Sequence, residues 1–150
     1  MLSFERIMVA IDFGESSTEA LEVALGLAKQ YRSALTLIHT WEVPSYAYTA
    51  MDFSAMDMLT PVQEAAREQL AALIAEVRKE LPEAKAILAR GVAWQEILAA
   101  IERGKPDLIV MGTHGRRGLR HALLGSVAEK IVRFSPVPVL TVRVKPAALT

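Results

Sequence analysis

The sequence predicts an α/β fold: a single-domain, doubly wound, five-stranded parallel sheet with helices on both faces. Short apolar runs alternate with longer stretches whose apolar residues recur every three or four positions, which is the pattern of strands alternating with helices. Such strands are joined by right-handed crossovers, and this makes the sheet parallel. The 150 residues have the length of one domain, and a hydrophobic content of 52% excludes a disordered chain. We therefore expect one domain over residues 1–150.

The first three elements are expected between residues 6 and 40. Residues 7–11 are apolar without interruption, which suits a strand covered on both faces, and this strand is expected over residues 6–12. Ser16-x-x-Glu19 has the form of a capping box, so a helix is expected from there to about residue 31. The second strand follows at residues 34–40.

A segment without regular periodicity, residues 41–59, follows the second strand. A loop of this length in a compact domain is unusual and is expected to be a lid, a partner surface or a mobile segment, although its composition also suits a partly buried loop. The next helix is expected to begin at Thr60-Pro61, because threonine caps well and proline suits the first helical position. It runs to about Leu81, before Pro82.

The second half of the chain continues the alternation. Gly104 is expected to close the third helix in the usual C-terminal role of glycine. Ser126 is expected to cap the fourth helix, and two prolines after that helix force an extended turn. The expected elements are a strand over 85–90, a helix over 94–104, a strand over 107–113, a helix over 125–134, a strand over 139–144 and a frayed tail over 145–150.

The bulk properties exclude several classes of protein. Lys+Arg and Asp+Glu number 17 each, so no global field favours nucleic acid or an anionic membrane. No apolar run approaches the ~20 residues of a membrane span, and the N-terminus lacks the pattern of a signal peptide. Without cysteine there is no disulfide framework. We expect a cytoplasmic protein with no nucleic-acid partner.

The most informative stretch begins in the fourth expected strand. Gly112 and Gly115 follow its apolar run, and Gly125-Ser126 precedes an amphipathic run. Glycine lets the backbone turn sharply and lets a ligand approach where a Cβ would block it. A helix start offers free N–H groups and the positive end of the helix dipole to an anion. The pattern Gly-x2-Gly-x9-Gly-Ser therefore indicates a phosphate cradle, the alternative being a plain turn and a helix cap.

This spacing, together with the strand before it, resembles the nucleotide-binding signature of the universal stress protein family. The resemblance extends over almost the whole chain, including residues 7–12, 35–39 and 136–142. It implies the strand order 3-2-1-4-5, a Rossmann-like fold of the adenine nucleotide alpha hydrolase-like kind, and binding of ATP, ADP or AMP. In that order the first and fourth strands are neighbours, and a crevice opens at their carboxyl ends with Asp12 facing Gly112.

The resemblance also implies which residues bind the nucleotide. Asp12 is expected to contact the ribose and phosphates, directly or through a divalent metal such as Mg2+; the plain alternative is an Asx turn. The main chain of Thr40 is expected to meet adenine, and the amide of Val127 to join the phosphate cradle. The expected nucleotide-binding residues are Ala10, Ile11, Asp12, Thr40, Met111, Gly112, His114, Gly115, Arg116, Gly125, Ser126 and Val127, with Asp12 also the metal ligand.

The histidines do not form a recognisable catalytic set. His39 sits in an apolar strand and is expected to be a core histidine with satisfied hydrogen bonds. His114 either touches phosphate or holds the glycine loop, and the nearby arginines either neutralise phosphate or form a solvated loop. No histidine cluster has the spacing of a zinc site. No catalytic residue is expected.

The function that the resemblance implies is an ATP-binding stress-response regulator, a cytoplasmic homodimer that acts as a nucleotide-dependent switch on an unknown protein partner. The last strand, Val139 to Val144, is expected to form the dimer, because pairing with a second copy satisfies the backbone groups of a sheet edge. The alternative is a slow ATPase or nucleotidyl-transfer enzyme using the same pocket, for which only Asp12 and His114 are nearby candidates. A nucleotide-free interaction module is disfavoured, because the glycine signature is intact.

Overall fold

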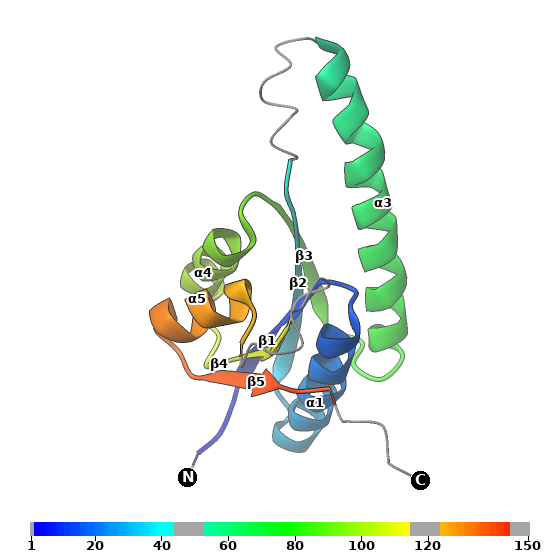
Figure 1. Ribbon diagram of the computed structural model, residues 1–150. Helices are drawn as coiled ribbons and strands as arrows, with labels where there is room; N and C mark the ends of the chain where they lie inside the picture. Colours follow the sequence, from blue (N-terminus) through cyan, green and yellow to red (C-terminus); the bar gives the residue numbers. More distant parts are fainter. Residues whose placement is uncertain (1, 44–52, 115–123, 145–150) are drawn as a thin grey trace, which may run out of the picture.

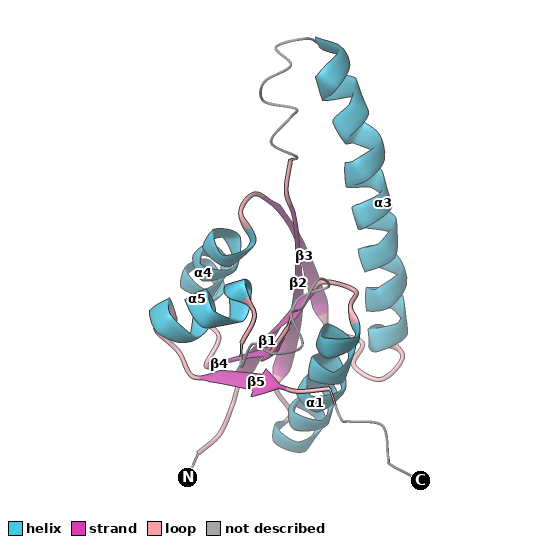
Figure 2. Cartoon of the chain, viewed as in Figure 1, coloured by secondary structure: helices cyan, strands magenta, loops and turns pink. Residues whose placement is uncertain are grey.

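The computed structural model describes residues 2–43, 53–114 and 124–144. Its strands are β1 (Arg6–Ile11), β2 (Ala34–Trp41), β3 (Lys85–Arg90), β4 (Leu108–Gly112) and β5 (Val139–Val142). Its helices are α1 (Glu15–Tyr31), α3 (Phe53–Arg78), α4 (Ala93–Gly104) and α5 (Ser126–Phe134). Figure 1 shows them in chain order and Figure 2 by type.

The five strands form one parallel sheet in the order β3-β2-β1-β4-β5. The fold class and the strand order expected from the sequence are thereby confirmed. β1 lies between β2 and β4, with Ile11 paired to His39 and Val9 paired to Val110. Because parallel strands run in the same direction, the carboxyl ends of these three strands meet at one edge of the sheet.

The two faces of the sheet carry separate cores. Alternate residues of β1 point to opposite faces: Ile7, Val9 and Ile11 pack with α1 and α3, whereas Met8 packs with α4 and α5. The helix that follows β1 and the helix that follows β4 therefore cover opposite faces. This is a topological switch point, where a crevice opens beyond the strand ends.

Helix α3 begins earlier than the sequence pattern predicts. It starts at Phe53, so the loop expected over residues 41–59 and the helix start expected at Thr60-Pro61 are wrong; residues 44–52 lie outside the described part. Residues 53–59 include alanine, methionine and leucine, which favour helix, and Pro61 lies inside it. Trp41, Val43 and Ala66 form a small separate core that holds α3 against the end of β2 (Figure 1).

Glycines, rather than serines, are the N-caps of α1 and α5. Gly14 is the N-cap of α1 and Gly125 that of α5, so the caps expected at Ser16 and Ser126 are wrong. The N-cap lies two residues before Ser16 in α1 and one residue before Ser126 in α5. After α4 the left-handed position is taken by Lys105, with φ 45°, so Gly104 is the last helical residue instead of the residue that ends the helix.

The last two strands are slightly shorter than expected. β4 ends at Gly112 and β5 at Val142, one and two residues before the expected ends. The tail over residues 145–150, expected to fray, lies outside the described residues. Within the described ranges, none of the helices has the length and apolar content needed to cross a membrane.

Candidate functional site

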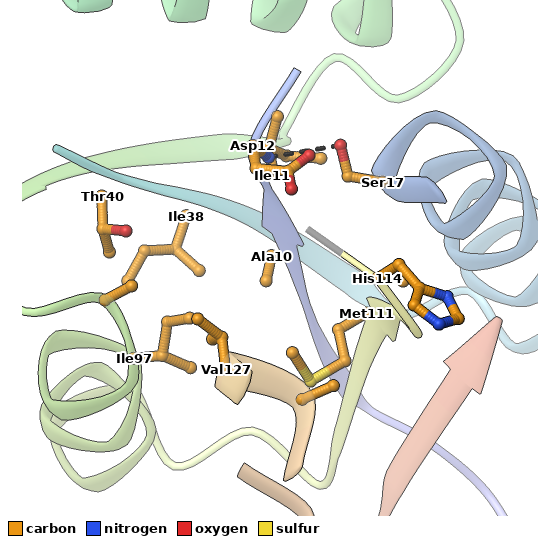
Figure 3. A pocket seen from close by; sticks show the side chains of 13 residues that line it. Ala10, Ile11, Asp12, Ser17, Ile38, Thr40, Ile97, Met111, His114 and Val127 are labelled. Carbon is orange, nitrogen blue, oxygen red and sulfur yellow. Dashed lines mark hydrogen bonds between the residues drawn. The ribbon is translucent and has the colours of Figure 1, made fainter. Parts of the chain in front are cut away.

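A cleft opens where the carboxyl ends of β1, β2 and β4 meet, and we refer to it as the β1–β4 cleft (Figure 3). Its volume is about 500 Å³, counted out to its open mouth. Its walls come from strands β1, β2 and β4 and from the first turns of α1, α4 and α5. The lining residues are Ala10, Ile11, Asp12, Ser17, Ile38, Thr40, Ala93, Ile97, Met111, Gly112, His114, Val127 and Ala128.

The structure brings most of the predicted nucleotide-binding residues to this cleft. Those that line it are Ala10, Ile11, Asp12, Thr40, Met111, Gly112, His114 and Val127. Gly125 and Ser126 lie at the start of α5, immediately before Val127, but do not line the cleft themselves. Gly115 and Arg116 lie outside the described residues. Asp12 and Gly112 line the same cleft from adjacent strands, as the strand order requires.

One half of the cleft is an apolar slot, most of which sequence reasoning missed. Ile38, Ala93, Ile97 and Ala128 contribute to it beside Met111 and Val127. Ile38 could have been found, because it lies two residues before Thr40 and so on the same face of β2. No sequence signal marks Ala93 or Ile97, since α4 reaches the cleft only through its packing on α5 and the sheet.

The carboxylate of Asp12 is held at one oxygen and faces the cleft. Oδ1 accepts a hydrogen bond of 2.8 Å from the backbone N–H of Gly14, which is the Asx turn that the sequence left as the alternative. The backbone N–H of Asp12 donates to Ser17 Oγ at 3.2 Å (Figure 3), and Ser17 Oγ–H donates to the Gly14 carbonyl at 3.2 Å. The Asx turn therefore does not compete with a ligand role, because it orients the carboxylate at the rim of the cleft.

The first turn of α5 presents backbone amides to the cleft. The first intrahelical bond runs from Glu129 N–H to the Gly125 carbonyl at 2.9 Å, so the amides of residues 126–128 have no acceptor within the helix. The amide of Gly125 is occupied, since it donates to the Thr113 carbonyl at 2.6 Å. Free amides and the positive end of the helix dipole together favour an anion at this point.

Gly112 has a packing reason to lack a side chain, in addition to the predicted room for a ligand. The sequence suggested that it makes room for a ligand, but a Cβ placed there would lie 2.8 Å from the carbonyl carbon of Ser16. The first turn of α1 therefore packs directly on the end of β4. Glycine at this position permits close contact between a helix and a strand, and the predicted role in making room for a ligand stays a prediction.

The backbone of Thr40 extends past the end of β1. Pairing of β1 with β2 ends at Ile11 and His39, so Thr40 lies one residue beyond the last pair. The Trp41 carbonyl accepts from Gly91 N–H at 2.9 Å and so points toward β3. Because successive residues of a strand direct their carbonyls to opposite sides, the Thr40 carbonyl points toward the cleft. It offers a hydrogen-bond acceptor at the end of the apolar slot.

The two histidines occupy different settings. His114 lines the cleft, and its Nδ1 lies 2.9 Å from Thr113 Oγ1. His39 is half-buried on the face of β2 that points away from the cleft, and its Nδ1 lies 2.7 Å from the Ile11 carbonyl. Since a carbonyl can only accept, that nitrogen carries the proton. The hydrogen bond expected of His39 as a packed histidine is therefore present.

A second hollow lies at the amino ends of the strands, on the far edge of the sheet from the β1–β4 cleft. Its volume is about 830 Å³, counted out to open solvent. Arg6, Thr36 and Lys85 are among its lining residues, and it includes none of the predicted nucleotide-binding residues.

The chain is similar to known proteins over almost its full length. Residues 3–143 match the model of the Universal stress protein family. The chain is 33% identical over 141 residues to the universal stress protein in the QAH/OAS sulfhydrylase 3' region of Thermus aquaticus, with 93% of this chain and 99% of that protein covered. It is 29% identical over 147 residues to universal stress protein YxiE of Bacillus subtilis, with 93% and 99% covered. The solved structure of hypothetical protein MJ0577 superimposes with a TM-score of 0.81 at 26% identity, with 97% and 100% covered.

Proposed function

The chain belongs to the universal stress protein family, and from this premise we propose that its β1–β4 cleft binds an adenine nucleotide, with ATP as the ligand. The observation that carries the proposal is the meeting of an apolar slot, the Asp12 carboxylate and the first turn of α5 around one cleft. A nucleotide has three parts that match these features: a flat apolar base, a ribose with hydroxyl donors, and an anionic phosphate tail.

The apolar slot suits the base, and the Thr40 carbonyl favours adenine over guanine. Ile38, Ile97 and Val127 offer aliphatic surface to both faces of a flat ring. The edge of adenine carries an amino group that can donate to the Thr40 carbonyl, whereas guanine presents a carbonyl oxygen at the same position. Two acceptors facing each other would leave both without a donor, which costs about 1–3 kcal/mol for a buried group.

The amides of residues 126–128 suit the phosphates, and Asp12 suits the ribose or a metal bound to the phosphates. Within the described part of the chain, no group of three or more His, Cys, Asp or Glu is arranged to hold a metal. A Mg2+ ion would therefore be held between Asp12 and the phosphate oxygens, and not in a protein site of its own. The proposal includes Gly115, Arg116, Gly125 and Ser126 as the remainder of the phosphate cradle.

Two solved structures of other universal stress proteins support adenine as the base. One is a complex with cAMP, at 19% identity and a TM-score of 0.65. The other is the protein from Archaeoglobus fulgidus in complex with dAMP, at 18% identity and a TM-score of 0.65. Both ligands are adenine nucleotides held by a protein of this fold.

We further propose that the protein is a cytoplasmic homodimer that senses nucleotide for a protein partner, without catalysing a reaction as its main role. The β1–β4 cleft offers phosphate-binding amides, but Asp12 Oδ1 is held by an Asx turn and His114 contacts Thr113. Hydrolysis would also need a positioned water or base and neutralisation of the charge that develops on the phosphate. Sustained release of phosphate over many turnovers with Mg2+, abolished by Asp12→Asn, would instead favour the slow ATPase or nucleotidyl-transfer alternative.

Calorimetric titration of the purified, nucleotide-free protein with ATP and with GTP tests the binding proposal. We expect saturable binding of ATP and at least about tenfold weaker binding of GTP, which corresponds to about 1.4 kcal/mol. Ala93→Leu should narrow the slot and weaken ATP binding, whereas Ala99→Leu on the same helix, outside the lining, is the matched control. Absence of saturable ATP binding by the wild-type protein, with no nucleotide in freshly purified material, would reject the proposal.

A further inference from the structure

The turn between β1 and α1 contains a strained residue next to Asp12. Phe13 has φ 62°, in the left-handed region that glycine favours and that a bulky side chain rarely adopts. Gly14, which follows, has φ −89°, so the left-handed position of the turn is taken by the aromatic residue. Such strain persists only where neighbouring contacts hold the backbone, and it occurs often at binding sites.

His39 holds this turn from both sides of Asp12. Before Asp12, the Ile11 carbonyl accepts a hydrogen bond of 2.7 Å from His39 Nδ1–H. After Asp12, the ring of Phe13 packs edge-on against the imidazole, with ring centroids 4.5 Å apart and planes at 62°. One side chain on β2 thus fixes both neighbours of the carboxylate that faces the cleft.

Ser17 and Gly14 fix Asp12 itself. Ser17 is buried and accepts the Asp12 backbone N–H, while the Gly14 amide holds Oδ1. The orientation of the carboxylate is therefore determined by its own turn, and the position of that turn on the sheet is determined by His39. A histidine that only fills the core would need neither the hydrogen bond to the Ile11 carbonyl before Asp12 nor the ring contact with Phe13 after it.

We propose that His39 is a positioning residue for Asp12, acting through the Ile11 carbonyl and the Phe13 ring to hold the carboxylate where a nucleotide or its metal ion reaches it. The inference rests on the proposed function, since it concerns the same cleft. His39 lies on the face of β2 away from the apolar slot, so it does not contact the base and its effect reaches the ligand only through Asp12.

A double-mutant cycle on ATP affinity, measured by calorimetry with Mg2+, tests the inference. Asp12→Asn keeps an oxygen for the Asx turn and removes the charge, and we expect it to weaken ATP about tenfold, equivalent to about 1.4 kcal/mol. His39→Leu should cause a similar loss, and the double variant should bind ATP no more than about twentyfold more weakly than wild type, well short of the roughly hundredfold loss of two independent effects, because both residues act on one contact. His39→Asn, which restores an N–H donor near the Ile11 carbonyl, should bind ATP more tightly than His39→Leu.

Phe13→Gly separates positioning from stability. Glycine adopts φ 62° without strain, so the variant should fold with a melting temperature no lower than that of His39→Leu, yet bind ATP more weakly than wild type because the contact with His39 is lost. Losses that multiply in the cycle, or unchanged affinity in Asp12→Asn or Phe13→Gly, would overturn the positioning role while leaving nucleotide binding intact. No ATP binding by the wild type would overturn the proposed function and this inference together.

Discussion

At the residue scale, the contact between Gly112 and Ser16 fixes α1 onto the end of β4. A Cβ at position 112 would overlap the backbone of Ser16, which a rotamer change cannot relieve. We expect Gly112→Ala to lower the free energy of unfolding by about 1–3 kcal/mol, the usual cost of overpacking. Denaturant unfolding measures this.

The matched control is Gly26→Ala, in the middle of α1. No atom lies within 4 Å of a Cβ built there. Alanine should stabilise that helix by about 0.5–1 kcal/mol, because glycine is the poorer helix former. Equal effects of the two substitutions would show that Gly112 does not mark a close contact.

Individual site residues were predictable where a motif and a strand end coincide. Asp12, Thr40 and Gly112 follow apolar strands directly, and the family resemblance assigned them to one site. Ser16 was assigned only to a capping box and Ser17 was given no role, because their contacts with β4 and with Asp12 form through the fold and leave no local pattern. The left-handed conformation of Phe13 is likewise invisible in the sequence, since glycine is the residue expected there.

At the scale of elements, α4 and α5 are joined outside the cleft by a stack of aromatic rings. Trp94 and Phe134 have ring centroids 6.0 Å apart, and Lys130 Nζ lies 5.4 Å from the Trp94 ring. Ala93, next to Trp94 on α4, lines the cleft, and so does Val127, three residues before Lys130 on α5.

Trp94→Ala should therefore weaken both the fold and the site. We expect a loss of about 2–3 kcal/mol in unfolding free energy, below that of a fully buried tryptophan, together with weaker ATP binding. Val132→Ala, an exposed residue of α5, is the control and should change stability by less than about 0.5 kcal/mol. A loss no larger than that of the control would mean that the stack does not join the helices.

The early start of α3 gives a prediction that distinguishes the structure from the sequence pattern. Inside a helix that begins at Phe53, Pro61 leaves the carbonyl of residue 57 without its donor. Pro61→Ala should then stabilise this part of α3 by about 1–3 kcal/mol. Slower hydrogen exchange in the adjoining turns would measure the gain. Unchanged exchange would indicate a helix that begins at Thr60, where proline costs nothing.

Element types were predictable from periodicity, whereas element ends were not. Thr60-Pro61 has all the marks of a helix start, but the packing of Leu59 and Ala66 against Trp41 and Val43 extends α3 beyond it. Tertiary contacts of this kind override a local capping signal. Ser16 and Ser126 likewise do not cap their helices, because Gly14 and Gly125 occupy the N-cap positions.

At the scale of the whole molecule, β5 is an edge strand that, among the described residues, pairs with β4 alone. The carbonyls of Pro138 and Val142 accept hydrogen bonds from β4, at 3.0 Å each, so the backbone groups of Leu140 also face inward and those of Thr141 face outward. Leu140 is exposed. These groups are available to a second copy of the strand.

Thr141→Pro should therefore convert the expected homodimer to a monomer. It removes an outward N–H and leaves the bonds between β4 and β5 in place. Sedimentation equilibrium at several concentrations measures the change. Leu140→Pro is the control, because it removes an inward N–H and should lower stability instead. A wild-type protein that is monomeric at every concentration would contradict pairing through β5.

The strand order could be predicted because of the family resemblance and not from periodicity, which does not say which strands are neighbours. Once β1 and β4 are adjacent, the convergence of Asp12 and Gly112 follows from the geometry of a parallel sheet. The apolar slot does not follow, because the position of Ala93 and Ile97 depends on how α4 packs.

The central claim is that an adenine nucleotide binds where β1, β4 and α5 meet, and its most direct test is backbone amide chemical-shift mapping during titration with ATP. We predict saturable shifts at residues 10–12, at Thr40 and at residues 126–128, on one binding curve. Shifts confined to the amino-end hollow around Thr36 and Lys85, or none that saturate, would contradict it.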